Sequence, residues 1–245
     1  MNAMLAPSRT IDAVEWNAIG AALDADGVAI LPNLLSPDET RDLAAHYDER
    51  ERFRSRVVMQ RHHFGRGEYQ YFRYPLPPLV QALRERLYEA LVPVANRWAE
   101  RLGNGNTFPP DLAAFLHRCR DAGQNRPTPL LLRYDAGDYN CLHQDLYGEH
   151  VFPLQAVILL SEPGRDFDGG ELVLVEQRPR AQSAARVIAL RQGDAAIIAT
   201  HHRPGRGARG WHRVSLRHGV SRVTRGRRCT AGIIFHDAAG RADGD

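Results

Sequence analysis

After residue 127 the chain consists of short apolar runs separated by glycine, proline and aspartate. The runs lie at residues 130–132, 157–160, 172–175, 195–198 and 232–235. Runs of about four apolar residues between turn-forming residues are typical of β-strands, because a helix needs a longer apolar face. Several short strands with turns between them predict an antiparallel β barrel or jelly roll in this half of the chain.

The first 126 residues have a different pattern and are expected to be mostly helical. The predicted elements are a helix at 11–23, a strand at 28–31 and three further helices, of which one starts at residue 37 and the others cover 79–102 and 111–120. Ser36 and Glu39 have the spacing of a capping box at the start of a helix. We therefore expect an α+β fold with a mainly β core: one domain over residues 1–245, with N-terminal helices packed on a jelly roll at 127–238.

Composition excludes several classes of protein. Hydrophobic residues make up 43% of the chain, which is enough for a sizeable core and argues against a disordered protein. No apolar run approaches the roughly 18 residues of a membrane span, and residues 1–8 lack the features of a secretory signal. Three scattered cysteines argue against a disulfide framework and against a cysteine zinc site. We expect a soluble, cytoplasmic protein with no membrane partner.

The basic residues are unevenly placed, although the net charge is only +3. All 32 of them are arginine, a preference that usually reflects a GC-rich genome and by itself predicts nothing about function. Residues 191–230 nevertheless hold ten arginines and one acid, Asp194. This local excess of positive charge bears on the charge of the substrate.

A histidine and an aspartate two residues apart follow one of the apolar segments. Residues i and i+2 of a strand point to the same side, so His143 and Asp145 can offer an imidazole and a carboxylate to one ion. Two histidines and one carboxylate on one face of an octahedron suit iron(II) in oxygenases, because three coordination positions stay open. The pair alone is a weak signal, since a surface histidine beside an aspartate is common.

A third ligand and a cation lie further along, in the run from His218 to Arg228. Valine stands at the second and fifth positions after the histidine, glycine at the eighth and arginine at the tenth. Gly226 can make the tight connection between two strands, so that Arg228 returns alongside the strand of His218 and points inward. The planar fork of arginine pairs two-to-two with a carboxylate. The spacing therefore predicts a carboxylate-binding arginine near the metal.

As a set and in this order, the motifs resemble the prolyl-4-hydroxylase-like branch of the 2-oxoglutarate/iron(II) dioxygenases, including a bacterial group of such oxygenases. The matching segments are 132–134, 143–145, 167–172, 192–194, 218 and 235–237. The resemblance implies a double-stranded β-helix, which is a form of jelly roll. It also implies that oxygen converts 2-oxoglutarate to succinate and CO2 while a substrate is hydroxylated or oxidatively demethylated.

The same resemblance assigns roles to residues of this chain. His143, Asp145 and His218 would be the catalytic ligands of Fe(II). Arg228 and Tyr134 would bind the distal carboxylate of 2-oxoglutarate. A further tyrosine, Tyr139, would lie near the metal or the substrate, and ascorbate is expected to help in vitro.

Three of these assignments have alternatives. His212 lies six residues before His218, so strand parity allows either to face inward, although the valine and glycine spacing fits His218. Arg227 is the alternative to Arg228, because adjacent strand residues face opposite sides and only one can enter the pocket. Tyr134 fits equally well as an aromatic residue that fills the barrel.

Two basic and aromatic stretches, 61–74 and 201–213, are expected to flank the pocket. Cations for phosphates and ring faces for bases are what a nucleic-acid strand requires, and a flipped damaged base needs such a lid. Arginine-rich loops that only meet solvent or pair with acids explain the same stretches. The candidate substrate contacts are Tyr139, Arg66, Tyr69, Arg206, Trp211 and His212.

Three functions remain open on the sequence. The first is a dioxygenase that acts on nucleic acid, for instance by oxidative demethylation, and the second is a hydroxylase of a protein side chain or small metabolite. The third is a non-catalytic jelly-roll sensor of a metal or ligand. A sensor needs no arginine for a cosubstrate, so the presence of Arg228 argues against the third.

Overall fold

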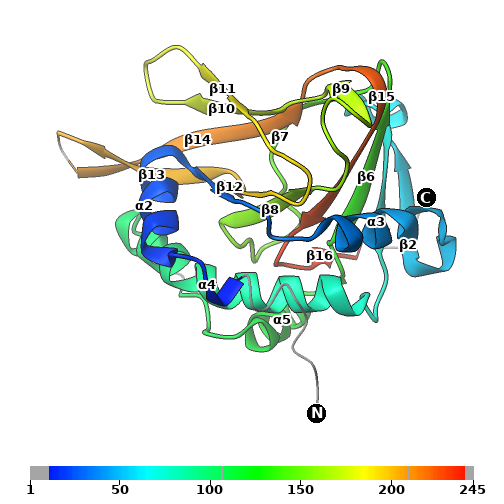
Figure 1. Cartoon of the computed structure of the whole chain (residues 1–245). Helices are drawn as coiled ribbons and strands as arrows, with labels where there is room; N and C mark the ends of the chain where they lie inside the picture. The colour runs from blue at the N-terminus through cyan, green and yellow to red at the C-terminus, as the bar shows by residue number, and fades with distance from the viewer. Residues whose placement is uncertain (1–10, 106, 209, 241–245) are drawn as a thin grey trace.

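Two large antiparallel sheets form the body of the computed structural model, which describes residues 11–105, 107–208 and 210–240 (Figure 1). In the larger sheet the order is β1 (Val28–Leu31), β12 (Ala195–Ala199), β8 (Leu154–Leu159), β15 (Val223–Ile233), β6 (Leu130–Asp135), β4 (Glu68–Phe72) and β2 (Phe53–Val58), with β9 (Phe167–Gly169) on β15. In the second it is β11 (Ala184–Ile188), β10 (Leu172–Gln177), β14 (Gly210–Val220), β7 (Tyr139–His143) and β3 (Gly65–Arg66), with β13 (His202–Gly207) on β14. A third, small sheet pairs β5 (Gln124–Arg126) with β16 (Ala238–Ala239).

The strands lie where the apolar runs are. The five runs fall in β6, β8, β10, β12 and the end of β15. Side chains from both large sheets join one hydrophobic core, for example Ile158 and Ile197 from one and Leu174 and Leu216 from the other. Each such side chain stabilises the fold by roughly 1.5–3 kcal/mol on burial. The predicted fold class, a jelly roll with helices packed on it, is confirmed.

Helices from the first half of the chain cover the sheets. They are α2 (Trp16–Asp26), α3 (Pro37–Ala45), α4 (Pro78–Arg101) and α5 (Leu112–Asp121), with three short 3-10 turns, η1 (His46–Asp48), η2 (Arg50–Arg52) and η3 (Met59–His62). The predicted capping box closes the start of α3, because the Ser36 hydroxyl accepts from Glu39 N and the Glu39 carboxylate accepts from Ser36 N. The long helix α4 runs beneath the sheets and buries Leu83, Leu87 and Leu91 completely (Figure 1).

The first half also supplies strands to the larger sheet. The predicted strand at 28–31 is β1, at one edge, whereas β4 and β2 extend the other edge beyond β6. The segment 68–72, Glu-Tyr-Gln-Tyr-Phe, is rich in aromatic residues that favour strands. This part of the chain therefore helps to build the barrel wall as well as covering it.

Some expectations concern residues outside the described ranges. Residues 1–8, where no secretory signal is expected, lie outside them, as does Arg209 in the arginine-rich stretch. Within the described ranges, no helix combines the length and the apolar character needed to cross a membrane.

Candidate metal centre

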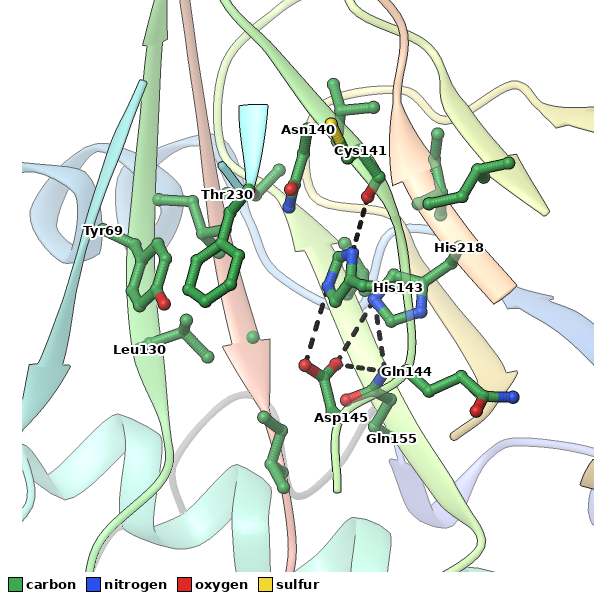
Figure 2. Close-up of a pocket in the computed structure, with 18 of the residues that line it drawn as sticks. Tyr69, Leu130, Asn140, Cys141, His143, Gln144, Asp145, Gln155, His218 and Thr230 are labelled. Carbon is green, nitrogen blue, oxygen red and sulfur yellow. Dashed lines mark hydrogen bonds and ion pairs between the residues drawn. The ribbon is translucent and has the colours of Figure 1, made fainter. Parts of the chain in front are cut away.

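Three side chains bring possible ligand atoms within 4.8 Å of one another: His143, Asp145 and His218. His143 ends β7 and stands directly opposite His218 of β14 in the antiparallel ladder. Nε2 of His218 lies 3.3 Å from Oδ2 of Asp145, and Nε2 of His143 lies 3.6 Å from Oδ1. Figure 2 shows the two rings and the carboxylate converging on one point. An imidazole–carboxylate–imidazole set of this kind suits Fe(II).

The competing histidine occupies another part of the same strand. His212 pairs with Gly205 of β13, near the tip of the β13–β14 hairpin, whereas His218 pairs with Leu174 on one side and His143 on the other. Equal parity puts both histidines on one face of β14, but only His218 lies where β7 passes beside it. The fold thus brings His218, and not His212, next to His143.

Hydrogen bonds orient the ring of His143 for coordination. Its Nδ1 lies 2.8 Å from the carbonyl oxygen of Cys141, which can only accept, so Nδ1 carries the proton and Nε2 keeps its lone pair. Burial, followed by the charge of His218, lowers the pKa of His143 and favours the neutral ring that a metal needs.

The carboxylate of Asp145 is held from both sides by neutral donors. The Tyr147 hydroxyl donates to Oδ1 at 2.6 Å, and Nε2 of Gln155 donates to Oδ2 at 2.8 Å. Burial opposes ionisation, but the hydrogen bond and charge of His218, with the charge of His143, hold the pKa of the carboxyl well below its usual value. The sequence motifs predicted neither Tyr147 nor Gln155 as a partner of Asp145. No local spacing links Gln155 on β8 to the His-x-Asp pair.

A cavity of about 290 Å³, which we call the metal cavity, is lined by His143, Asp145 and His218. Four tyrosines, Tyr69, Tyr71, Tyr134 and Tyr147, and the partly exposed ring of Phe64 contribute to its wall. Its volume is near the lower end of pockets that hold small organic ligands. The cavity can therefore take a small cosubstrate and a planar group beside it.

A buried arginine and a buried tyrosine line the same cavity, from the larger sheet. Arg228 of β15 stands opposite Tyr134 of β6, and the two residues are 2% and 0% exposed. Nη1 of Arg228 and the hydroxyl of Tyr134 have no hydrogen-bond partner among the described residues. An unpaired buried guanidinium is costly, so these atoms fit the carboxylate of a ligand such as 2-oxoglutarate.

The neighbours of Arg228 explain its inward course. Gly170, with φ at +63°, lies against it, and a Cβ there would come within 2.9 Å of Cδ of Arg228. Arg227 points the other way, to solvent, where its Nε donates to Asp135 at 2.7 Å. Adjacent strand residues face opposite sides, and the structure buries the second of the two arginines.

The path between His218 and Arg228 differs from the expected one. The chain reverses between Val220 and Val223, whereas Gly226 lies within β15 and pairs with Phe167 of β9. Moreover β14 and β15 belong to different sheets, so Arg228 lies across the cavity from His218 and not beside its strand. The expectation of a hairpin turn at Gly226 was wrong, because the connection passes from one layer of the jelly roll to the other. The glycine, at φ +74°, instead makes room for the carbonyl of Asp166.

Only one of the six candidate substrate contacts lines the cavity, namely Tyr69. Arg66 and Tyr139 face each other on β3 and β7 outside that wall. The Arg66 guanidinium lies 3.3 Å from Asp138, and the Tyr139 ring lies under Arg222, 5.2 Å from its guanidinium carbon.

The other three candidates, Arg206, Trp211 and His212, lie on the β13–β14 hairpin, which projects from the sheet (Figure 1). The Trp211 ring is flanked by Arg206, at 5.1 Å, and by Arg101 of α4, at 4.4 Å. The described residues of the stretch 201–213 do not line the metal cavity, which corrects the expectation that the stretch flanks that pocket. Its local sequence carries no sign that the hairpin extends past the sheet.

Comparisons with known proteins place the chain in a wider context. Residues 67–238 match the model of a family described as "Oxygenase, catalysing oxidative methylation of damaged DNA". Uncharacterized proteins from two strains of Mycobacterium tuberculosis are each 48% identical over 165 residues, which cover 67% of this chain and 71% of theirs.

Solved structures share the fold at low identity. A prolyl hydroxylase from Trichoplax adhaerens, in complex with a peptide fragment of hypoxia inducible factor, has a TM-score of 0.58 at 14% identity, over 97% of this chain and 94% of that one. A prolyl-4-hydroxylase from Pseudomonas putida has a TM-score of 0.56 at 16% identity, over 92% of this chain and 100% of that one. At such identities the likeness concerns the fold alone.

Proposed function

The chain belongs to the oxygenase family whose model matches residues 67–238, and we propose that it oxidises a methyl group on a base of damaged nucleic acid. It is a 2-oxoglutarate-dependent non-haem iron oxygenase of the prolyl-4-hydroxylase-like kind. When bound, iron and 2-oxoglutarate supply oxygen activation: 2-oxoglutarate and O2 yield succinate and CO2, and one oxygen atom goes into a C–H bond of the substrate. The choice of substrate class is the proposal.

One observation carries the assignment of residues: a buried arginine, whose Nη1 has no partner in the described part of the chain, lies in the same cavity as the three possible metal ligands. In our proposal His143, Asp145 and His218 hold the iron. Arg228 pairs with the carboxylate of 2-oxoglutarate that is remote from the metal, and the Tyr134 hydroxyl donates to the same group. The ligand would then satisfy two polar groups that otherwise remain unpaired.

Replacement of Arg228 by methionine is expected to raise the Kd for 2-oxoglutarate at least about 100-fold, because two charge-assisted hydrogen bonds of roughly 1.5–3 kcal/mol each are lost. Calorimetric titration with 2-oxoglutarate, on protein loaded with Mn(II), measures the change. Without 2-oxoglutarate the variant should be at least as stable as the wild type, since it removes a buried unpaired charge.

The matched control is Arg227→Met, which alters an exposed arginine one residue away. Its Kd for 2-oxoglutarate should stay within about threefold of the wild-type value, as expected for an exposed ion pair. A larger loss in Arg227→Met than in Arg228→Met would contradict the assignment.

The hydroxyl of Tyr147 is expected to position the metal ligand Asp145. Its loss in Tyr147→Phe should weaken metal binding about 10- to 100-fold, the usual cost of removing a group that orients a ligand. Competition between Mn(II) and a chromogenic chelator measures the affinity without any turnover. Tyr139→Phe, outside the cavity wall, is the control, and equal affinities in the two variants would show that Tyr147 has no such role.

The cavity wall favours a planar aromatic substrate. Tyr69 and Tyr71 meet edge to face at 5.4 Å, and Tyr71 and Tyr147 do so at 6.2 Å. At the rim, the exposed ring of Phe64 stacks on His62 at 5.4 Å. Aromatic side chains of this kind stack against unpaired bases and against bases turned out of the helix.

Tyr71 acts as a hydrogen-bond donor to the base in this proposal. Burial raises the pKa of Tyr71, with a smaller contribution from the charge of Tyr69, so its hydroxyl stays protonated at neutral pH. A protonated hydroxyl can donate to a ring nitrogen or exocyclic oxygen of a base. After hydroxylation, a methyl group on a ring nitrogen becomes a hydroxymethyl group, whose C–N bond breaks to release formaldehyde and return the proton to the nitrogen.

The direct test supplies Fe(II), 2-oxoglutarate, ascorbate and a single-stranded oligonucleotide with one N-methylated base. We expect the oligonucleotide to stimulate succinate formation and to release formaldehyde in equal amount. A proline-containing peptide serves as the comparison substrate. Stimulation by the peptide and none by the oligonucleotide would replace our proposal by the hydroxylation of protein, while leaving the oxygenase class intact.

A further inference from the structure

A second cavity, of about 450 Å³, lies beside the segment that follows β7, on the side of this segment that faces away from the metal cavity. Leu146 lines it, whereas the residues on either side, Asp145 and Tyr147, line the metal cavity. Helices α4 and α5, the segment between them, residues 149–153 and the base of the β13–β14 hairpin supply the rest of its wall. The oxidation described above makes no use of this cavity.

Basic side chains predominate in its wall. Two arginines, Arg118 and Arg213, and three histidines, His150, His201 and His202, line it against one acid, Glu149. The two arginines have neutral partners, because Arg118 donates to the carbonyl oxygen of Thr107 and Arg213 donates to Oδ1 of Asn104. Among the described residues neither arginine forms an ion pair. Their charges are therefore available to an anion.

Among the side chains that the structure describes, His201 contributes an unpaired polar atom to this wall. Its Nδ1 is buried and has no hydrogen-bond partner within the described ranges, and its ring centroid lies 4.6 Å from that of His202. Burial lowers the pKa of His201 to about 4, and the charges of His202 and Arg213 add to this effect. With its proton on Nδ1, the neutral ring can donate a hydrogen bond to a bound anion.

We propose that this cavity binds a phosphate group. The planar, multidentate guanidinium groups of Arg118 and Arg213 match the geometry of a phosphate group. Apolar residues of the wall, such as Phe108 and Pro153, can pack against the rest of a nucleotide. We assign this phosphate, on the basis of the proposed function, to the nucleic-acid strand whose base enters the metal cavity.

One side chain, that of Gln144, links the walls of the two cavities by hydrogen bonds. Gln144 lines the metal cavity between His143 and Asp145, and its Nε2 donates to the carbonyl oxygen of His201 at 3.1 Å. The same amide group donates to the carbonyl oxygen of Leu216 at 2.8 Å. A phosphate at His201 would therefore lie beside the segment that carries two of the proposed metal ligands.

The test compares two exposed arginines on the same strand, β14. Arg213 lines the cavity and Arg217 does not. Binding of a fluorescent single-stranded oligonucleotide is measured by anisotropy at several salt concentrations, without oxygen or 2-oxoglutarate. We expect Arg213→Gln to weaken binding about tenfold and to reduce the slope of log K against log salt by nearly one. Arg217→Gln should change the affinity less than threefold.

Inorganic pyrophosphate distinguishes the source of the phosphate. We expect it to displace the oligonucleotide from the wild-type protein, and from Arg217→Gln, at lower concentrations than from Arg213→Gln. Equal effects of the two substitutions would mean diffuse attraction and would overturn the proposed site. Arg213-dependent binding of pyrophosphate without competition by the oligonucleotide would overturn the strand as the source and leave a site for a free anion.

These outcomes are independent of the oxidation chemistry, because binding is measured without turnover. An oligonucleotide that binds as expected but keeps its methyl group would overturn the proposed function and support the phosphate site. Demethylation that is unaffected by Arg213→Gln at every substrate concentration, together with unchanged binding, would overturn the phosphate site alone.

Discussion

Replacement of His218 by alanine is expected to abolish 2-oxoglutarate turnover, with a loss well beyond the roughly 100-fold that follows removal of a group orienting a metal ligand. The change removes one of three possible ligands and leaves Asp145 without the imidazole at 3.3 Å. Succinate formation with saturating Fe(II) measures activity, and Mn(II) affinity measures binding directly. Both should fall together, because the same side chain is responsible for both.

His212→Ala is the matched control, since it removes a histidine from the same face of the same strand. His212 pairs with Gly205 in the projecting hairpin and belongs to no cluster of ligand atoms in the described ranges. Turnover and Mn(II) affinity in this variant should stay within about twofold of wild type. Loss of metal binding in His212→Ala and its retention in His218→Ala would refute the ligand assignment.

Replacement of Asp237 by alanine is expected to lower the free energy of unfolding by about 3–5 kcal/mol, the cost of breaking a buried ion pair on one side. The Arg84 guanidinium and the Asp237 carboxylate are completely buried and lie 2.7 Å apart. Arg84 also donates to the carbonyl oxygens of Ile234 and Phe235, and the Tyr74 hydroxyl donates to Asp237 at 2.9 Å. The network holds the segment that follows β15, residues 234–237, against α4.

Urea denaturation gives the unfolding free energy of the Asp237 variant. A decrease of this size should lower the Tm by roughly 6–20 °C for a chain of this length. Asp121→Ala, which breaks an exposed pair with His117, is the control and should change stability by less than about 0.5 kcal/mol. Similar effects of the two substitutions would show that the buried pair has no special weight.

Asp237 also illustrates what a motif alone leaves open. The sequence places it at the end of a matching segment, where a carboxylate in a terminal loop is the expectation. The structure instead buries Asp237 and pairs it with Arg84, 153 residues away. Strand and helix patterns do not specify which helix will supply a counter-ion to a distant carboxylate, because that depends on how layers stack.

Local patterns determined the elements of this protein and most of its chemistry. Short apolar runs predicted five of the strands, Ser36 and Glu39 predicted the start of α3, and a spacing of two placed His143 and Asp145 on one side. These inferences hold because periodicity and capping depend only on residues a few positions apart. The family resemblance extended them to iron and 2-oxoglutarate.

The tertiary structure decided the choices between residues of equal local merit. It brought His218, and not His212, beside β7, and it buried Arg228 across the cavity instead of in a hairpin with His218. It also carried Arg206 and Trp211 away from the metal on the projecting hairpin and opened a second cavity beside its base. Strand parity specifies a face, but which face is buried, and against which sheet, follows from the packing of distant segments.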